Sequence, residues 1–182
     1  MGKIIVAGQE FPCDHPVINF RQSPASKYPG SSPWDASQLK CIPITSRSRR
    51  DTSPANRENV NRFAHRPGIG PGMHDSKWNW HKDALKKTQA LVKQFVVHYD
   101  GCLDSRMCME VLHNERGYSC HFLIDNDGTI FQTLDLALMG FQSAGFNSFT
   151  VGVEFANRGD VLRHPEQNPY YTRQSKIPSI QK

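Results

Sequence analysis

The chain has 182 residues, of which 37% are hydrophobic, and carries a formal net charge of +5 with a pI near 9.0. This length favours one domain with an additional arm, and no segment is apolar over the length that a membrane span requires. The basic charge suits an anionic partner such as a cell-wall polymer, but no zinc-finger, helix-turn-helix or aromatic ribonucleoprotein pattern accompanies it, so we do not expect a nucleic-acid partner.

Residues 1–80 are expected to form a small β element followed by an arm. Two short apolar runs, at residues 4–6 and 17–20, are typical of strands, and a turn-like insert at residues 12–16 lies between them. From residue 21 to about residue 72 the chain is rich in Ser, Pro, Asn and Arg and lacks periodicity. This composition predicts an extended arm that a protein partner would order.

Residues 81–182 are expected to form the main domain. An approximately helical apolar stripe at residues 83–94 predicts a helix that leads directly into a strand at residues 94–99. Asp104 or Ser105 can cap a second, amphipathic helix, whose default role is to pack against a sheet.

Two further segments complete the predicted sheet. The Asp127-Gly128 pair is a strong signal for a tight turn within a hairpin at residues 120–132, and residues 150–155 read as a buried strand. Strand, helix, hairpin and strand in this order predict an α/β fold with a central mixed β-sheet flanked by helices.

His98 is the first candidate for chemistry. It alternates with Phe95 and Tyr99 and therefore leaves the sheet on the opposite face from them, near the strand's carboxyl end, where open α/β sheets hold their ligands. The alternative is a histidine that is hydrogen-bonded within the fold. His121, which precedes another apolar run, leaves three roles open: metal ligand, substrate contact or core residue.

Glu154 is the second candidate because it is the one acid in an apolar strand. It shares a face with Gly152, which leaves open space beside the carboxylate. A carboxylate in such a place is costly unless it is paired or functional. The alternative role is a salt bridge to Arg116 or Arg158.

Four segments of the second half carry a combined pattern, namely residues 95–100, 111–125, 127–135 and 147–157. In order and spacing they resemble the zinc-dependent N-acetylmuramoyl-L-alanine amidases of the type-2 class and the related peptidoglycan-recognition proteins. The resemblance covers about residues 94–160. It implies an amidase-like fold, of which we expect the carboxyl-terminal part to be missing from this chain.

The resemblance implies cleavage of the amide bond between the lactyl group of N-acetylmuramic acid and L-alanine of the peptidoglycan stem peptide. His98 matches the first zinc ligand, and Glu154 matches the carboxylate that assists proton transfer and positions the attacking water. Zinc would lower the pKa of its bound water and polarise the amide carbonyl. The residues that would contact peptidoglycan or a muropeptide are Tyr118, His121, Gln142 and Asn147.

The chain departs from the family pattern at three places. Gln142 stands where relatives carry a histidine near the substrate, and Cys120 stands where some relatives carry a tyrosine. The second and third zinc ligands of relatives come after the last strand, where this chain offers only His164 in a proline-flanked loop. A catalytic zinc site takes about three protein ligands and a water, so the predicted Zn²⁺ site is partial.

The sequence is therefore compatible with two classes of function. The first is a peptidoglycan hydrolase, and the second is a non-catalytic peptidoglycan-binding or assembly subunit on the same fold. A structural or effector component without peptidoglycan contact is a third alternative. Zinc content and release of stem peptides would separate these classes.

The five cysteines form no Cys-x-x-Cys pair, which favours reduced thiols in a protein made in the cytoplasm, although Cys102 and Cys108 are near enough in the sequence to bridge. The apolar run at the start of the chain is too short for a signal peptide. Action on a cell wall would then require delivery by another route.

Overall fold

The computed structural model describes most of the chain outside the predicted arm. The described residues are 1–22, 63–75, 77, 79–109, 111–112, 116 and 118–157, together with the backbone of three two-residue strands at 41–42, 171–172 and 179–180. Most of the predicted arm, as well as Arg158 and His164, lies outside the described residues.

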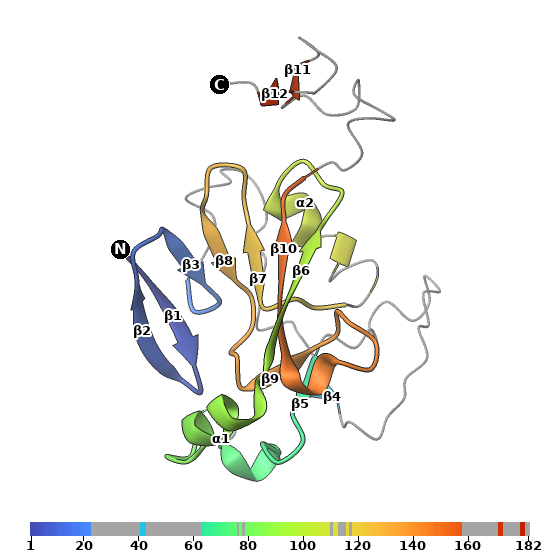
Figure 1. The fold of residues 1–182 in the computed structure, drawn as a ribbon. Coiled ribbons are helices and arrows are strands. Elements are labelled where there is room, and N and C mark those ends of the chain that lie inside the picture. The colour runs from blue at the N-terminus through green and yellow to red at the C-terminus, as the bar shows by residue number, and fades with distance from the viewer. Residues whose placement is uncertain are drawn as a thin grey trace.

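A five-stranded mixed sheet with the order β3-β8-β7-β10-β6 forms the centre of the molecule (Figure 1). Strand β10 runs parallel to both of its neighbours, whereas β7 and β8 form an antiparallel hairpin. Gly128 in the hairpin turn has φ 82°, a conformation that glycine adopts at little steric cost. The strands predicted at residues 17–20, 94–99 and 150–155 and the predicted hairpin are confirmed. The strands are β3 (Val17–Asn19), β6 (Gln94–Tyr99), β7 (Phe122–Ile124), β8 (Ile130–Gln132) and β10 (Thr150–Phe155).

A smaller sheet, of order β4-β5-β9, lies at the lower end of the central sheet in Figure 1. Its strands are β4 (Cys41–Ile42), β5 (Phe63–His65) and β9 (Leu138–Gly140). Phe63, Ala64 and Ile69 are buried. The prediction that the arm extends to about residue 72 is therefore wrong for residues 63–72, because a short apolar cluster among prolines and glycines has no periodicity to reveal it.

Two α-helices accompany the sheet within the described residues. The predicted first helix is confirmed as α1 (Ala84–Leu91), which buries Ala84 against Ile69 and Ala137. Helix α2 (Ser105–Met109) begins at the predicted cap and packs Cys108 and Met109 on Leu123 and Phe131. Neither helix has the length and apolar character needed to cross a membrane.

Helical cover of both sheet faces is not seen within the described residues. Phe95, Val97 and Tyr99 on the edge strand β6 are 58%, 63% and 69% exposed. The remaining described elements are short. They are the 3-10 helices η4 (Pro71–Met73) and η6 (Asn147–Phe149) and the antiparallel pair β11 (Tyr171–Thr172) and β12 (Ser179–Ile180).

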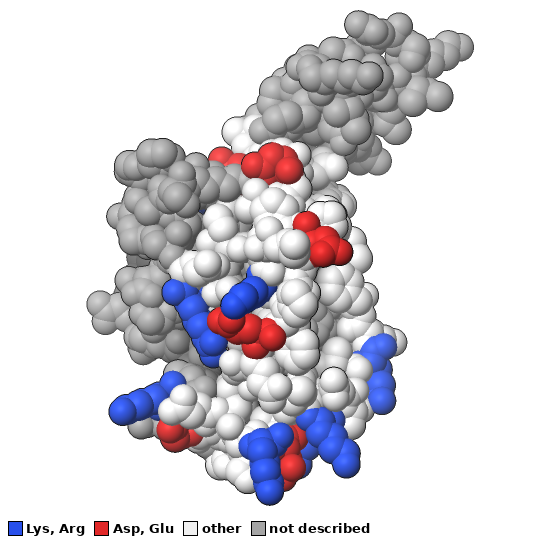
Figure 2. All heavy atoms as spheres, turned by 90° about the vertical axis from the view of Figure 1, so that its left-hand side faces the viewer, with Lys and Arg blue, Asp and Glu red and all other residues white. Residues whose placement is uncertain are grey.

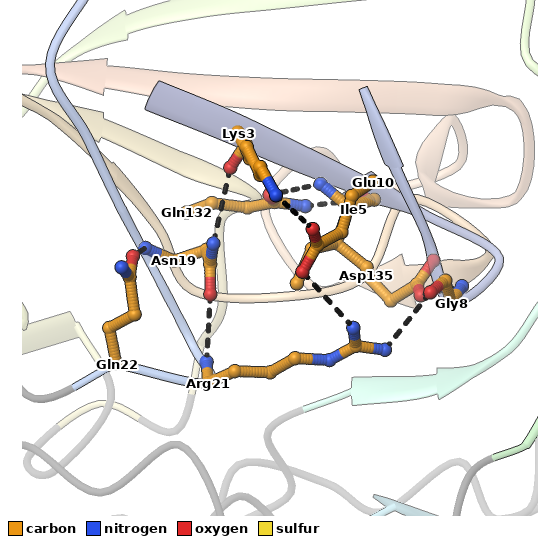
Figure 3. Close-up of polar contacts among 9 residues, drawn as sticks. All are labelled: Lys3, Ile5, Gly8, Glu10, Asn19, Arg21, Gln22, Gln132 and Asp135. Atoms are coloured by element: carbon orange, nitrogen blue, oxygen red, sulfur yellow. Dashed lines mark hydrogen bonds and ion pairs between the residues drawn. The ribbon is translucent and has the colours of Figure 1, made fainter. Parts of the chain in front are cut away.

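An amino-terminal hairpin of β1 (Gly2–Val6) and β2 (Gln9–Cys13) docks on the edge of the central sheet (Figures 1 and 3). The Gln132 carboxamide bonds both the N–H and the C=O of Ile5, each at 2.7 Å. The Asp135 carboxylate accepts hydrogen bonds from the N–H groups of Ala7 and Gly8 at 2.7 and 2.8 Å. Strands on both sides of residue 80 thus belong to one structural unit, and part of the insert predicted as a turn is the strand β2.

Charged side chains are interspersed on the side of the molecule that carries this hairpin (Figure 2). Lys3 Nζ lies 2.7 Å from Glu10 Oε2, and Arg21 Nη1 lies 3.8 Å from Glu10 Oε1. These three side chains are 43–65% exposed. Exposed ion pairs of this kind contribute little to stability, because water screens the charges. Packing and the buried polar contacts, rather than these pairs, hold the hairpin in place.

Candidate functional site

His98 and Glu154 are direct neighbours in the central sheet. The parallel register of β6 and β10 pairs Glu154 with His98, as it pairs Gly152 with Val96. Paired residues of adjacent strands project from the same face, so His98, Gly152 and Glu154 share what we call the His98 face. Helix α2 packs on this same face through Leu123, which pairs with Glu154 from β7.

Glu154 is 8% exposed, and within the described residues it forms no ion pair, so a salt bridge to Arg116 is not present. Burial, with a smaller contribution from the charge of Asp100, raises the pKa of the Glu154 carboxyl to about 7. A carboxyl group with this pKa holds or releases a proton near neutral pH, as general acid–base catalysis requires.

Asp100 lies two residues beyond His98, where β6 ends, and joins the ends of the two central strands. Its Oδ1 atom accepts hydrogen bonds from the N–H groups of Cys102 and Asn157 at 2.8 and 3.0 Å. Burial raises the pKa of Asp100, and these two hydrogen bonds act in the opposite direction. Sequence reasoning missed this residue, although its spacing of two from His98 on a strand is a signal for the same face.

The half-buried side chain of His98 fits a ligand role in part. Its Nε2 atom is buried and has no hydrogen-bond partner among the described residues. Buried polar atoms without partners are rare and call for an explanation, and an imidazole nitrogen is a common metal ligand. Among the residues that the structure describes, however, no three His, Cys, Asp or Glu side chains form a group that could hold a metal ion. The described residues alone do not complete a zinc site.

Gln142 fills the open space that the sequence predicted beside Glu154. A Cβ atom at Gly152 would collide with the Gln142 carboxamide, so glycine is required for this side chain to lie on the strand. The Gln142 Nε2 atom donates to Thr150 Oγ1 at 3.2 Å, and Cys120 Sγ lies 3.6 Å from Gln142 Oε1. The carboxamide is therefore held on the His98 face over Gly152, the neighbour of Glu154 on that face of β10.

Asn147 shapes the loop that carries Gln142. Its Oδ1 atom accepts hydrogen bonds from the N–H groups of Gln142 and Ser143 at 3.1 and 2.7 Å. The side chains of Asn147, Gln142 and Tyr118 are each partly exposed. Tyr118 is tied through its backbone N–H to Leu112 O at 2.8 Å.

His121 lies in the core with no exposed surface. Its Nδ1 atom accepts from the Gly152 N–H at 3.2 Å, and its Nε2 atom lies 3.1 Å from both Leu138 O and Arg66 Nη2. Burial and the nearby Arg66 guanidinium lower the pKa of His121 to about 3. Because such a side chain cannot reach a ligand in this conformation, we do not retain His121 among the substrate contacts.

The thiols beside the site are unreactive in character. Cys102, Cys108 and Cys120 are free and buried, so the bridge between Cys102 and Cys108 that the sequence permits is not formed. Burial raises the pKa of each of these thiols, in the case of Cys102 to about 11. Their main role is packing, since the nucleophilic form of cysteine is the thiolate.

Part of the chain is similar to a known protein family. Residues 70–176, more than half of the chain, match the family model described as N-acetylmuramoyl-L-alanine amidase. The matched range includes β6, β10 and the loop between β9 and β10. No curated protein matches the chain to a significant degree.

Proposed function

Because the chain belongs to the N-acetylmuramoyl-L-alanine amidase family, and so to the peptidoglycan hydrolases in general, we propose that it cleaves the amide bond between the lactyl group of N-acetylmuramic acid and L-alanine of the stem peptide. The observation that carries this proposal is the pairing of His98 with Glu154 on adjacent parallel strands. A histidine and a carboxylate on one face of the sheet can act on the same scissile bond of a bound substrate.

Glu154 is the proposed proton carrier. Its carboxylate takes a proton from the attacking water, the hydroxyl adds to the amide carbonyl carbon, and the carboxyl group returns the proton to the nitrogen of L-alanine as the C–N bond breaks. The products are a free lactyl carboxylate and a stem peptide with a free amino terminus. The burial of Glu154 supports this role because it favours the protonated form that the second step needs.

His98 is the proposed first ligand of a zinc ion. When bound, zinc would lower the pKa of water and polarise the amide carbonyl. The Nε2 atom of His98 supports this role because it has no hydrogen-bond partner among the residues that the structure describes. The further ligands would come from outside these residues, where His164 is the candidate. Gln142, Asn147 and Tyr118 are the proposed substrate contacts.

The test is an analysis of products from purified peptidoglycan. We expect stem peptides that begin with L-alanine, together with intact glycan strands whose lactyl groups carry no peptide, both identified by mass spectrometry. Cleavage between sugars, cleavage within the stem peptide, or no product at all from the zinc-loaded protein would contradict the proposal. Cosedimentation with peptidoglycan in that last case would favour a binding subunit.

A further inference from the structure

Arg66 lies before the family-matched residues, in the part of the chain predicted as an arm, yet its side chain has no exposed surface. Its guanidinium group donates four hydrogen bonds to backbone carbonyl groups, and Nη2 also lies 3.1 Å from His121 Nε2. Nε donates to Leu136 O at 2.9 Å, Nη1 to Asn147 O and Ser148 O at 3.1 and 3.0 Å, and Nη2 to Thr150 O at 2.8 Å.

The carbonyl groups that Arg66 binds bracket one segment. Leu136 precedes the small-sheet strand β9, Asn147 and Ser148 lie in η6, and Thr150 begins β10. Between them runs the loop of residues 141–149, which carries Gln142. One guanidinium group therefore ties the end of this loop both to the chain before β9 and to the strand that bears Glu154.

The bonds are of a strong kind. Burial lowers the pKa of Arg66 to about 10, so the group is still charged at neutral pH. Hydrogen bonds from a charged donor are stronger than neutral ones, and the planar guanidinium fixes their directions. A lysine at this position would present a single nitrogen and could not bridge the same four carbonyl oxygens.

We propose that Arg66 is a positioning residue, whose guanidinium group holds the 141–149 loop so that the Gln142 carboxamide stays over Gly152 beside Glu154. This inference rests on the proposed function in so far as Gln142 contacts substrate. It makes residues upstream of the family-matched domain a working part of its substrate site. The order of contacts is Arg66 to the loop, the loop to Gln142, and Gln142 to the stem peptide.

The first test follows the loop itself, without any need for hydrolysis. Hydrogen exchange of the folded full chain, read by mass spectrometry, should become faster in peptides covering residues 141–149 in Arg66→Lys, while exchange in β7 and β8 stays as in the wild type. Ile5→Ala, which truncates a buried side chain of the amino-terminal hairpin, is the control for general destabilisation. Unchanged exchange at 141–149, or equal acceleration in both variants, would overturn the proposal.

The second test follows the substrate site. With soluble muropeptide, Arg66→Lys should raise KM roughly tenfold, the effect of about one lost hydrogen bond, with a smaller change in kcat, whereas Ile5→Ala should leave KM unchanged. Guanidinium ion at millimolar concentration should partly restore the KM of Arg66→Ala. Equal KM values for wild type and Arg66→Lys would overturn the proposal. An inactive wild type would instead reject the proposed function. The hydrogen-exchange result would still test whether Arg66 holds the 141–149 loop.

Discussion

Glu154 and His98 occupy paired positions on β10 and β6, so the carboxylate and the imidazole leave the same face of the sheet. The backbones of neighbouring strands lie about 4.8 Å apart. The pairing depends on strand register, because a slip by one residue would turn Glu154 to the face that carries Val97 and Tyr99. The parallel alignment of these two strands is thus the structural basis of the proposed site.

Removal of the His98 imidazole should abolish zinc binding. We expect about one zinc ion per chain in the wild-type protein and less than a tenth of that in His98→Ala, measured by elemental analysis after dialysis, because a catalytic zinc site has only about three protein ligands. His15→Ala, at an exposed histidine, should retain the metal. Zinc that remains in His98→Ala would remove His98 from the ligand set.

An added methyl group at Gly152 should displace Gln142. Gly152→Ala is expected to lower amidase activity about as much as Gln142→Ala, because the new Cβ occupies the place of the carboxamide. The double variant should then be no worse than either single variant, as residues acting through one contact are non-additive. Additive losses in this double-mutant cycle would show that Gly152 acts independently of Gln142.

Asp135 should govern the docking of the amino-terminal hairpin. Asp135→Ala removes the acceptor for the N–H groups of Ala7, Gly8 and Ala137 and leaves two buried donors and one partly buried donor unpaired, at a cost of about 1–3 kcal/mol or more. We expect a lower free energy of unfolding and faster proteolysis within residues 1–22. Glu10→Ala, which removes only exposed ion pairs, should leave the free energy of unfolding nearly unchanged.

His121 should make the protein less stable in acid. Its pKa is about 3 in the folded protein against an ordinary value of 6.5, so between these values the unfolded chain binds a proton that the folded chain does not. The free energy of unfolding therefore falls as pH decreases through this window, by up to about 1.4 kcal/mol per pH unit from this residue.

His121→Asn provides the measurement, because Asn cannot titrate and its side-chain oxygen can take the place of Nδ1. Denaturant unfolding at several pH values should show a shallower slope between pH 6.5 and 3 in His121→Asn than in the wild type. The raised pKa values of Asp135 and Glu154 act in the opposite sense but are present in both proteins. Identical slopes would mean that His121 is not the buried neutral group described above.

The strands, hairpin and helices of the family-matched part were predictable because each has a local signal. Residues 94–99 and 150–155 alternate with the period of a strand, Asp127-Gly128 marks a turn, and residues 84–91 carry a helical stripe. The same alternation placed His98 and Glu154 on faces of their own strands. The sequence did not give the register between the two strands, which depends on tertiary pairing and which places His98 beside Glu154.

The contacts that hold the site were not predictable, since they connect residues far apart in the sequence. Arg66 reaches carbonyl groups 70 to 84 residues further along the chain, and Asp135 bonds backbone groups more than 120 residues before it. Backbone carbonyl acceptors have no sequence signature. Likewise, Gly152 signalled space beside Glu154, but nothing in the sequence indicated that Gln142 fills it.

The most direct test compares initial rates of L-alanine amino-terminus release from purified peptidoglycan for wild type, Glu154→Gln and Glu10→Gln. Glu154→Gln keeps the size of the side chain but cannot carry the proton, so we predict a loss of about 100-fold or more at unchanged zinc content, with Glu10→Gln close to wild type. A Glu154→Gln variant that hydrolyses at the wild-type rate would contradict the assignment of Glu154 as the proton carrier of this site.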